Sequence, residues 1–238
     1  LAIIKFRAIS LPMAKFKLLL LVGLLVLAPT WLRAAEESVV LADGTTIEVL
    51  FFLPQQADKP PLAVLLAGGS NNQFMARAQF WLGKEMVERG WAVAVPISAE
   101  GRMYFIDNPD LFLGIIEDLH NRHELQPGKT LLAGISSGGS AALAIAAERP
   151  QRYLGVVATP GRLLDEQRFQ TLQGLPVYLR IGEKDNFRWN NRLGTMVDLL
   201  QVAGANVDAA IVPGAKHIFP LDWENLQTWL EKIQQRPL

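Results

Sequence analysis

The chain lacks cysteine entirely over its 238 residues, and this absence excludes several kinds of chemistry. Without cysteine there are no disulfide bonds, no thiolate nucleophile and no zinc or iron–sulfur site held by thiolates. Histidine is almost as scarce, because the chain contains only His120, His123 and His217. A reaction that needs an imidazole to accept a proton near neutral pH must therefore use one of these three side chains.

Acidic side chains are missing from the first 34 residues, which carry five basic ones. Residues 13–17 are positively charged, residues 18–28 form an unbroken apolar run, and Ala34 and Ala35 are small. This order is typical of a secretory signal peptide that is cut after Ala34 or Ala35. The apolar run is shorter than the roughly 18 residues of a membrane-spanning helix. We therefore expect export to the periplasm or the medium, with no lasting membrane anchor.

The mature protein is expected to be one domain over residues 36–238. Residues 1–35 would combine an upstream extension with the signal peptide, and translation would begin at Leu1 or at Met13. Beyond position 34 the chain carries 18 basic and 23 acidic side chains. A mildly acidic domain gives no reason to expect nucleic acid as a partner.

Two β-rich runs, 38–42 and 45–53, flank an Asp-Gly pair, and this pattern predicts an antiparallel hairpin. Beyond the hairpin, short apolar runs alternate with longer amphipathic ones, which is typical of a parallel sheet covered by helices on both faces. The predicted strands are 62–67, 92–96, 130–133, 153–158, 177–181 and 209–212. The predicted helices are 75–89, 109–124, 139–149, 163–173, 190–203 and 222–235.

The motif Gly-Ile-Ser-Ser-Gly at 134–138 lies between a predicted strand and a predicted helix of small residues. In this context G-x-S-x-G predicts a nucleophile elbow, a tight turn that lifts a serine hydroxyl above the edge of the sheet. Ser136 is the expected nucleophile. Ser137 and Ser140 are weaker candidates, because only Ser136 has glycine two positions before and two positions after it.

The whole layout resembles the α/β-hydrolase superfamily, in particular its serine esterases and lipases, over residues 38–235. The resemblance implies an α/β fold: a mostly parallel central sheet, an N-terminal antiparallel hairpin and helices on both faces. No large cap is expected, because the interval 159–175 holds only one short predicted helix.

A serine hydroxyl needs a base to remove its proton, and His217 is the expected base. It follows the last predicted strand, where a loop can lean over the edge of the sheet. His120 and His123 precede the nucleophile strand and are interpreted as solvated helix residues. Their spacing of three would suit a pair of metal ligands, but no ligand-rich segment accompanies them, so no metal site is expected.

The resemblance implies the chain order serine, acid, histidine, and it assigns the acid to a glycine turn after a strand. Asp185 in the segment Gly182-Glu-Lys-Asp matches that turn and is the expected acid. Glu183 and Asp165 remain open as alternatives. Asp185 also suits an Asx-turn that caps the next helix, and the two roles are compatible.

Two backbone N–H groups are expected to bind the oxyanion that forms during acyl transfer. One belongs to Ser137, the residue after the nucleophile. The other belongs to the glycine loop after strand 62–67, with Gly69 as the expected donor and Gly68 and Ser70 as its neighbours. Ala67 departs from the histidine that many relatives carry there, but a backbone donor does not depend on that side chain.

Two loops are candidates for the wall of a substrate pocket, and both combine aromatic with arginine side chains. The candidate substrate-binding residues are Arg102, Tyr104, Phe105, Phe187 and Trp189. An ordinary role as loop anchors stays open for all of them.

These features together predict an exported serine hydrolase that cleaves carboxylic esters through an acyl-enzyme and uses no cofactor. Its partner would be a small ester or acyl compound, of a kind that the sequence leaves open along with the oligomeric state. A serine peptidase or acyltransferase would use the same groups, and a non-catalytic binding protein of this fold is a further alternative.

Overall fold

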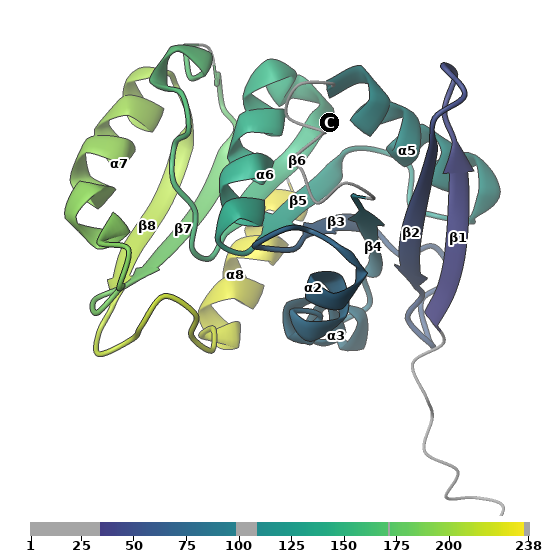
Figure 1. The fold of residues 1–238 in the computed structure, drawn as a ribbon, viewed down its shortest axis with the longest axis horizontal. Coiled ribbons are helices and arrows are strands. Elements are labelled where there is room, and N and C mark those ends of the chain that lie inside the picture. Colours follow the sequence, from purple (N-terminus) through teal and green to yellow (C-terminus); the bar gives the residue numbers. More distant parts are fainter. Residues whose placement is uncertain (1–33, 99–108, 171, 236–238) are drawn as a thin grey trace, which may run out of the picture. The chain divides into compact units, whose positions relative to one another are not determined.

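The computed structural model describes residues 34–98, 109–170 and 172–235. These residues form one eight-stranded sheet in the order β1-β2-β4-β3-β5-β6-β7-β8 (Figure 1). The strands are β1 (Ala34–Val40), β2 (Thr46–Phe52), β3 (Leu62–Leu66), β4 (Ala92–Ile97), β5 (Thr130–Gly134), β6 (Tyr153–Ala158), β7 (Pro176–Gly182) and β8 (Asn206–Val212). The helices are α2 (Gln73–Ala78), α3 (Trp81–Glu88), α5 (Pro109–Arg122), α6 (Ser137–Glu148), α7 (Leu193–Val202) and α8 (Trp223–Gln234). Short 3-10 helices are η1 (Pro150–Arg152), η2 (Glu166–Arg168) and η3 (Trp189–Arg192).

The predicted hairpin is confirmed in β1 and β2, which pair antiparallel with Val40 opposite Thr46. At its turn the Asp43 carboxylate accepts a hydrogen bond from the backbone N–H of Thr45 at 2.9 Å, and this bond holds the pKa of Asp43 below its ordinary value. Strand β1 starts at Ala34, earlier than predicted, so the expected cleavage site lies at the start of this strand. Strand β2 also pairs antiparallel with β4, and β3 to β8 are parallel to one another.

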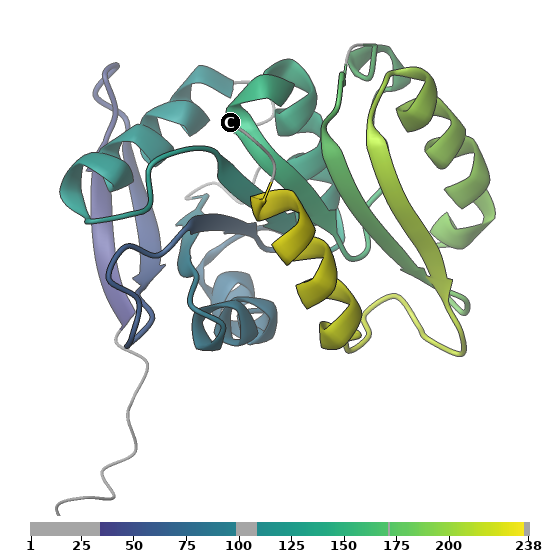
Figure 2. The same cartoon turned by 180° about the vertical axis from the view of Figure 1, so that it is seen from behind.

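Helices cover both faces of the sheet, as predicted. Helices α5, α6 and α7 lie on one face and α8 on the other (Figures 1 and 2). The side chains of β3 alternate accordingly: Leu62, Val64 and Leu66 join the core beneath α5, α6 and α7. Their neighbours Ala63 and Leu65 are buried on the opposite face. In the described part of the chain, no helix combines the length and apolar character needed to cross a membrane.

The prediction of a single helix over 75–89 is wrong, because the structure divides this segment into α2 and α3 at Gln79 and Phe80. The Gln79 side chain accepts a hydrogen bond from the backbone N–H of Gly68 at 2.6 Å. The Phe80 ring stacks on Phe52 with a centroid distance of 3.8 Å. Both contacts reach outside the segment, so its own amphipathic pattern could not reveal the break.

The α-helix predicted over 163–173 is also wrong, since the described residues there form only η2. Asp165 caps this short turn by accepting a hydrogen bond from the backbone N–H of Gln167 at 3.0 Å. The backbone N–H of Leu172 donates to the carbonyl of Ala203 at 2.7 Å, beyond the end of α7. Bonds to a distant element therefore replace the helical bonds that this sequence would otherwise make.

The sheet brings three separated segments to one edge. Strands β5, β6, β7 and β8 are neighbours and run parallel, so their carboxyl ends meet at the same edge. Ser136 follows β5, Asp185 follows β7 and His217 follows β8. Ligands of open α/β sheets bind at this edge of the strands.

Candidate active site

Ser136 occupies a strained turn between the end of β5 and the start of α6. Its backbone has φ 59° and ψ −120°, a combination that side chains with a Cβ rarely adopt. The turn is held by a hydrogen bond of 2.8 Å from the backbone N–H of Ser136 to the carbonyl of Pro160. Strained residues of this kind cluster at functional sites, where the surrounding structure stabilises them.

Glycines surround the turn because backbone approaches it from several sides. A Cβ on Gly134 would clash with the carbonyl oxygen of Gly138. A Cβ on Gly138 would clash with the carbonyl oxygen of Leu66, and one on Gly139 with that of Pro160. The first turn of α6 can therefore pack directly on the strand ends that border it.

His217 lies on the loop after β8 and is only 7% exposed. Its Nε2 is 2.7 Å from the Ser136 hydroxyl oxygen. Gly182, at the end of β7, allows the loop to pass closely, because a Cβ there would clash with the carbonyl oxygen of Lys216. Gly182 at the end of β7 and the loop after β8 thus together place the His217 imidazole beside Ser136.

Asp185 lies behind His217 and is 5% exposed. Its Oδ1 is 3.1 Å from His217 Nδ1 and also accepts a hydrogen bond of 2.8 Å from the backbone N–H of Phe187. With a proton on Nδ1, the imidazole donates to Asp185 and leaves Nε2 as an acceptor for the Ser136 hydroxyl. The structure therefore joins the three residues named from the sequence in one chain of hydrogen bonds.

The alternative acids have other partners. The carboxylate of Glu183 accepts a hydrogen bond from the backbone N–H of Gly214 at 2.7 Å, which ties the turn after β7 to the loop that carries His217. Asp165 caps η2 through Gln167. Among the described residues, the carboxylate partner of His217 is therefore Asp185.

The alternative serines also have other partners. The Ser137 hydroxyl donates to the carbonyl of Gly69 at 3.2 Å. The Ser140 hydroxyl donates to the carbonyl of Ser136 at 3.2 Å and accepts from the backbone N–H of Arg162 at 2.9 Å. The two hydroxyls thereby connect α6 to the loops that carry Gly69 and Arg162.

Gly69 and Ser137, the residues predicted to form an oxyanion site, lie close together, because the Ser137 hydroxyl donates to the carbonyl of Gly69. Within the described residues, neither N–H donates to another protein group. The N–H of neighbouring Gly68 is already bound by the Gln79 side chain, so it is not available to a ligand. Gln79 thereby holds the loop that carries Gly69, and no sequence motif pointed to this function of its side chain.

The remaining histidines lie on or just after α5 and are half-buried, so they are less solvated than predicted. The His123 ring stacks on Phe51 with a centroid distance of 4.2 Å, and its Nε2 is 3.0 Å from the Glu37 carboxylate. Burial lowers the pKa of His120. Histidine, aspartate and glutamate side chains of the described residues form no group of three or more suited to a metal ion.

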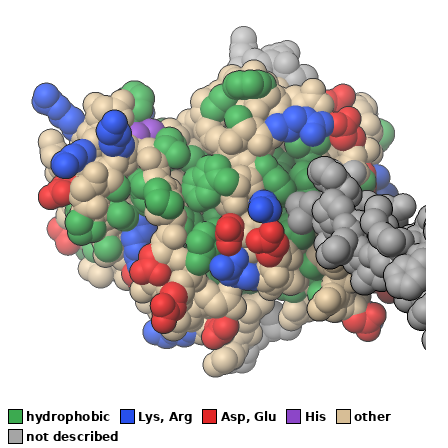
Figure 3. Space-filling view, turned by 90° about the horizontal axis from the view of Figure 1, so that it is seen from below, with side chains coloured by type: hydrophobic (Ala, Val, Ile, Leu, Met, Phe, Trp, Pro, Cys, Tyr) green, Lys and Arg blue, Asp and Glu red, His purple; other side chains and the backbone are tan. Residues whose placement is uncertain are grey.

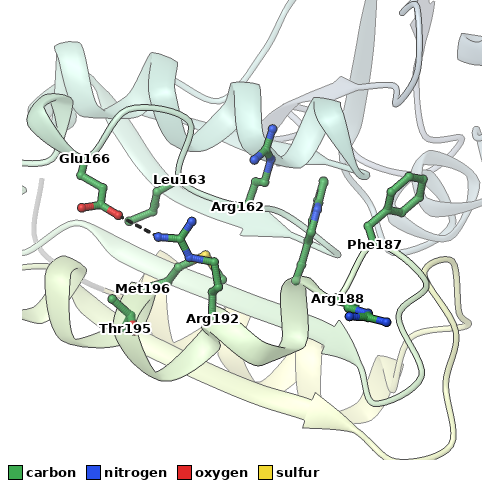
Figure 4. Close-up of a pocket in the computed structure, with 9 residues that line it drawn as sticks. Arg162, Leu163, Glu166, Phe187, Arg188, Arg192, Thr195 and Met196 are labelled. Atoms are coloured by element: carbon green, nitrogen blue, oxygen red, sulfur yellow. Dashed lines mark hydrogen bonds and ion pairs between the residues drawn. The ribbon is translucent and has the colours of Figure 1, made fainter.

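Two of the predicted pocket residues contact His217. The rings of Phe187 and Trp189 meet the imidazole edge-on, with centroid distances of 4.6 Å and 4.9 Å. Both also line a cavity of about 160 Å³ between the segments that follow β6 and β7 (Figure 4). The other predicted pocket residues, Arg102, Tyr104 and Phe105, lie outside the described residues.

A comparison with protein families decides the identity of the chain. The model of the family described as "Putative esterase" matches residues 115–236, slightly more than half of the chain. The chain belongs to the Esterase family. The matched region contains Ser136, Asp185 and His217. A comparison with curated proteins gave no match.

Solved structures share the fold of this Esterase family member at low sequence identity. Dienelactone hydrolase from Anabaena variabilis is 18% identical with a TM-score of 0.60, covering 85% of this chain and 96% of its own. A cold-adapted esterase from an Arctic intertidal metagenomic library is 16% identical with a TM-score of 0.64, covering 87% and 95%. Acylaminoacyl peptidase from Pyrococcus horikoshii is 14% identical with a TM-score of 0.66, covering 90% and 43%. The α/β-hydrolase fold expected from the sequence is confirmed, and the chain is a hydrolase.

Proposed function

We propose that the chain is an exported serine hydrolase that cleaves carboxylic esters through an acyl-enzyme. The observation that carries the proposal is the hydrogen-bonded chain from Ser136 through His217 to Asp185. The backbone N–H groups of Gly69 and Ser137 lie beside the serine, and neither donates to a protein group within the described residues. Membership of the Esterase family agrees with this chemistry.

In the proposed reaction Ser136 Oγ forms a bond to the ester carbonyl carbon while His217 Nε2 takes the hydroxyl proton. The carbonyl oxygen becomes an oxyanion, which the N–H groups of Gly69 and Ser137 bind. The bond to the alcohol oxygen then breaks, and His217 returns the proton to that oxygen. A water molecule repeats the sequence on the acyl-enzyme, releasing the carboxylic acid and restoring Ser136. Asp185 stabilises the imidazolium in both halves.

Labelling with a fluorophosphonate tests the nucleophile directly. We expect the purified protein to form one covalent adduct, and peptide mapping to locate the adduct on Ser136. Heat-unfolded protein serves as the control and should stay unlabelled, because the reactivity depends on the folded arrangement. Absence of an adduct, or an adduct on Ser137 or Ser140, would refute the proposal.

Export is the second part of the proposal and rests on the charge and apolar pattern of residues 13–35, most of which lie outside the described residues. When the full chain is expressed in a bacterium, we expect the periplasmic or secreted protein to begin at Ala35 or Glu36. N-terminal sequencing of that fraction is the measurement. A protein that stays in the cytoplasm with its N-terminus at Met13 or earlier would contradict export.

A further inference from the structure

The cavity beside His217 carries more positive than negative charge. Among the described residues, its lining includes three arginines, Arg162, Arg188 and Arg192, and one acidic side chain, Glu166. Figure 3 shows lysine and arginine side chains gathered at one corner of the face that it draws. A neutral ester would gain nothing from this charge, whereas an anionic group would be attracted to it.

The three arginines are not equivalent. Arg192 pairs with Glu166 at 3.3 Å, so its charge is largely compensated. In Figure 4 the Arg188 side chain is turned away from this ion pair. Arg162 is exposed and, within the described residues, makes no salt bridge with an acid. Arg188 is also exposed, but Arg162 is the arginine whose guanidinium lies over the Trp189 ring, so it is the better placed to bind an anion beside His217.

Trp189 connects Arg162 to the proposed base. The guanidinium carbon of Arg162 lies 5.5 Å from the centroid of the Trp189 ring, and the same ring meets His217 edge-on at 4.9 Å. A single indole thus contacts both the cation and the imidazole. Its apolar surface can support the carbon skeleton of a ligand whose charged end reaches the guanidinium.

The position next to His217 indicates which part of an ester would enter the cavity. His217 must donate a proton to the oxygen of the departing alcohol, so that oxygen has to lie within hydrogen-bond reach of Nε2. In the proposed mechanism, the carbonyl oxygen of the ester instead faces the backbone N–H groups of Gly69 and Ser137. Groups attached to the alcohol oxygen would then lie against Trp189, on the side of Arg162.

We propose that Arg162 binds a carboxylate carried by the alcohol part of the ester, so that the preferred substrates are esters of hydroxy acids. This inference rests on the proposed function, since it assumes that His217 protonates a leaving alcohol. Guanidinium groups bind carboxylates through paired charge-assisted hydrogen bonds. The contact is the same before and during the reaction, so it acts on KM rather than on kcat.

Two pairs of esters and one substitution test the inference. The first pair, 4-acetoxybenzoate and its methyl ester, differs by a charge on the alcohol part. The second, phenyl hydrogen adipate and phenyl hexanoate, differs by a charge on the acyl part. In Arg162→Gln we expect KM for 4-acetoxybenzoate to rise about tenfold or more with kcat nearly unchanged. The other three esters should keep their kinetic constants.

Arg152→Gln is the matched control. Arg152 lies in η1, ahead of β6 and away from the carboxyl ends of the strands, and it pairs with Glu117 of α5. It should leave all four esters unaffected. Equal KM values for 4-acetoxybenzoate in the parent and Arg162→Gln would overturn the inference while leaving the proposed function intact. An effect confined to phenyl hydrogen adipate would overturn it too. Failure of the parent protein to hydrolyse any of the four esters would instead overturn the proposed function.

Discussion

Replacing Ser136 by alanine is expected to lower kcat/KM for p-nitrophenyl acetate by about 10⁴- to 10⁶-fold. The variant keeps His217 and both oxyanion donors but has no oxygen to attack the ester carbonyl. Whatever activity remains comes from water attacking a substrate polarised by the oxyanion donors. Steady-state kinetics on purified protein measure the loss.

Ser137→Ala is the matched control for this experiment. It removes a neighbouring hydroxyl that donates to the carbonyl of Gly69 but keeps the backbone N–H at position 137. We expect it to retain activity within about tenfold of the parent, because one exposed neutral hydrogen bond contributes little. Ser136→Ala should also keep its melting temperature, since alanine and serine are equally strained at φ 59°. A Ser136→Ala variant with activity close to that of the parent would refute the mechanism.

The turn at Ser136 could be predicted because its requirements are local. A serine forced to a positive φ needs neighbours without side chains, and that need is visible as glycines at 134, 138 and 139. Most strands could be predicted for a related reason. They are buried on both faces and therefore form continuous apolar runs in the sequence. The predicted strand 153–158 has the same bounds as β6.

The elements that could not be predicted depend on contacts between distant segments. Gln79 interrupts a helix because its side chain binds the backbone of Gly68, which lies in another loop. His123 is shielded because Phe51 and Glu37 from the hairpin pack on it. An amphipathic pattern records which face of a segment is buried, but not which partner covers it.

The choice of acid shows the same limit within the site. Asp185, Glu183 and Asp165 all follow strands, so position along the chain could not separate them. The structure separates them by hydrogen bonds: Glu183 accepts from Gly214, Asp165 caps η2, and Asp185 contacts His217. The catalytic role of that contact is a prediction that mutation can test.

Asp185→Ala is expected to lower kcat by about 10⁴-fold, because His217 would lose both the group that orients it and the charge that stabilises its protonated form. Asp185→Asn separates these two contributions. In the parent, one oxygen, Oδ1, accepts from the backbone N–H of Phe187 and faces His217 Nδ1. The amide oxygen of asparagine can occupy that position and keep the proton on Nδ1, so only the charge is lost. We expect a smaller decrease, about 10²- to 10³-fold.

Glu183→Gln provides the control, because it removes a neighbouring negative charge while its amide oxygen can still accept from the backbone N–H of Gly214. Its kcat should stay near that of the parent, and circular dichroism should confirm that all three variants are folded.

The ranking of the two Asp185 variants is informative in itself. If asparagine were as damaging as alanine, the oxygen held by Phe187 would not be keeping the imidazole in its active form. If Asp185→Ala kept near-normal turnover while Glu183→Gln lost it, the acid would be Glu183, and the contact between Asp185 and His217 would be structural.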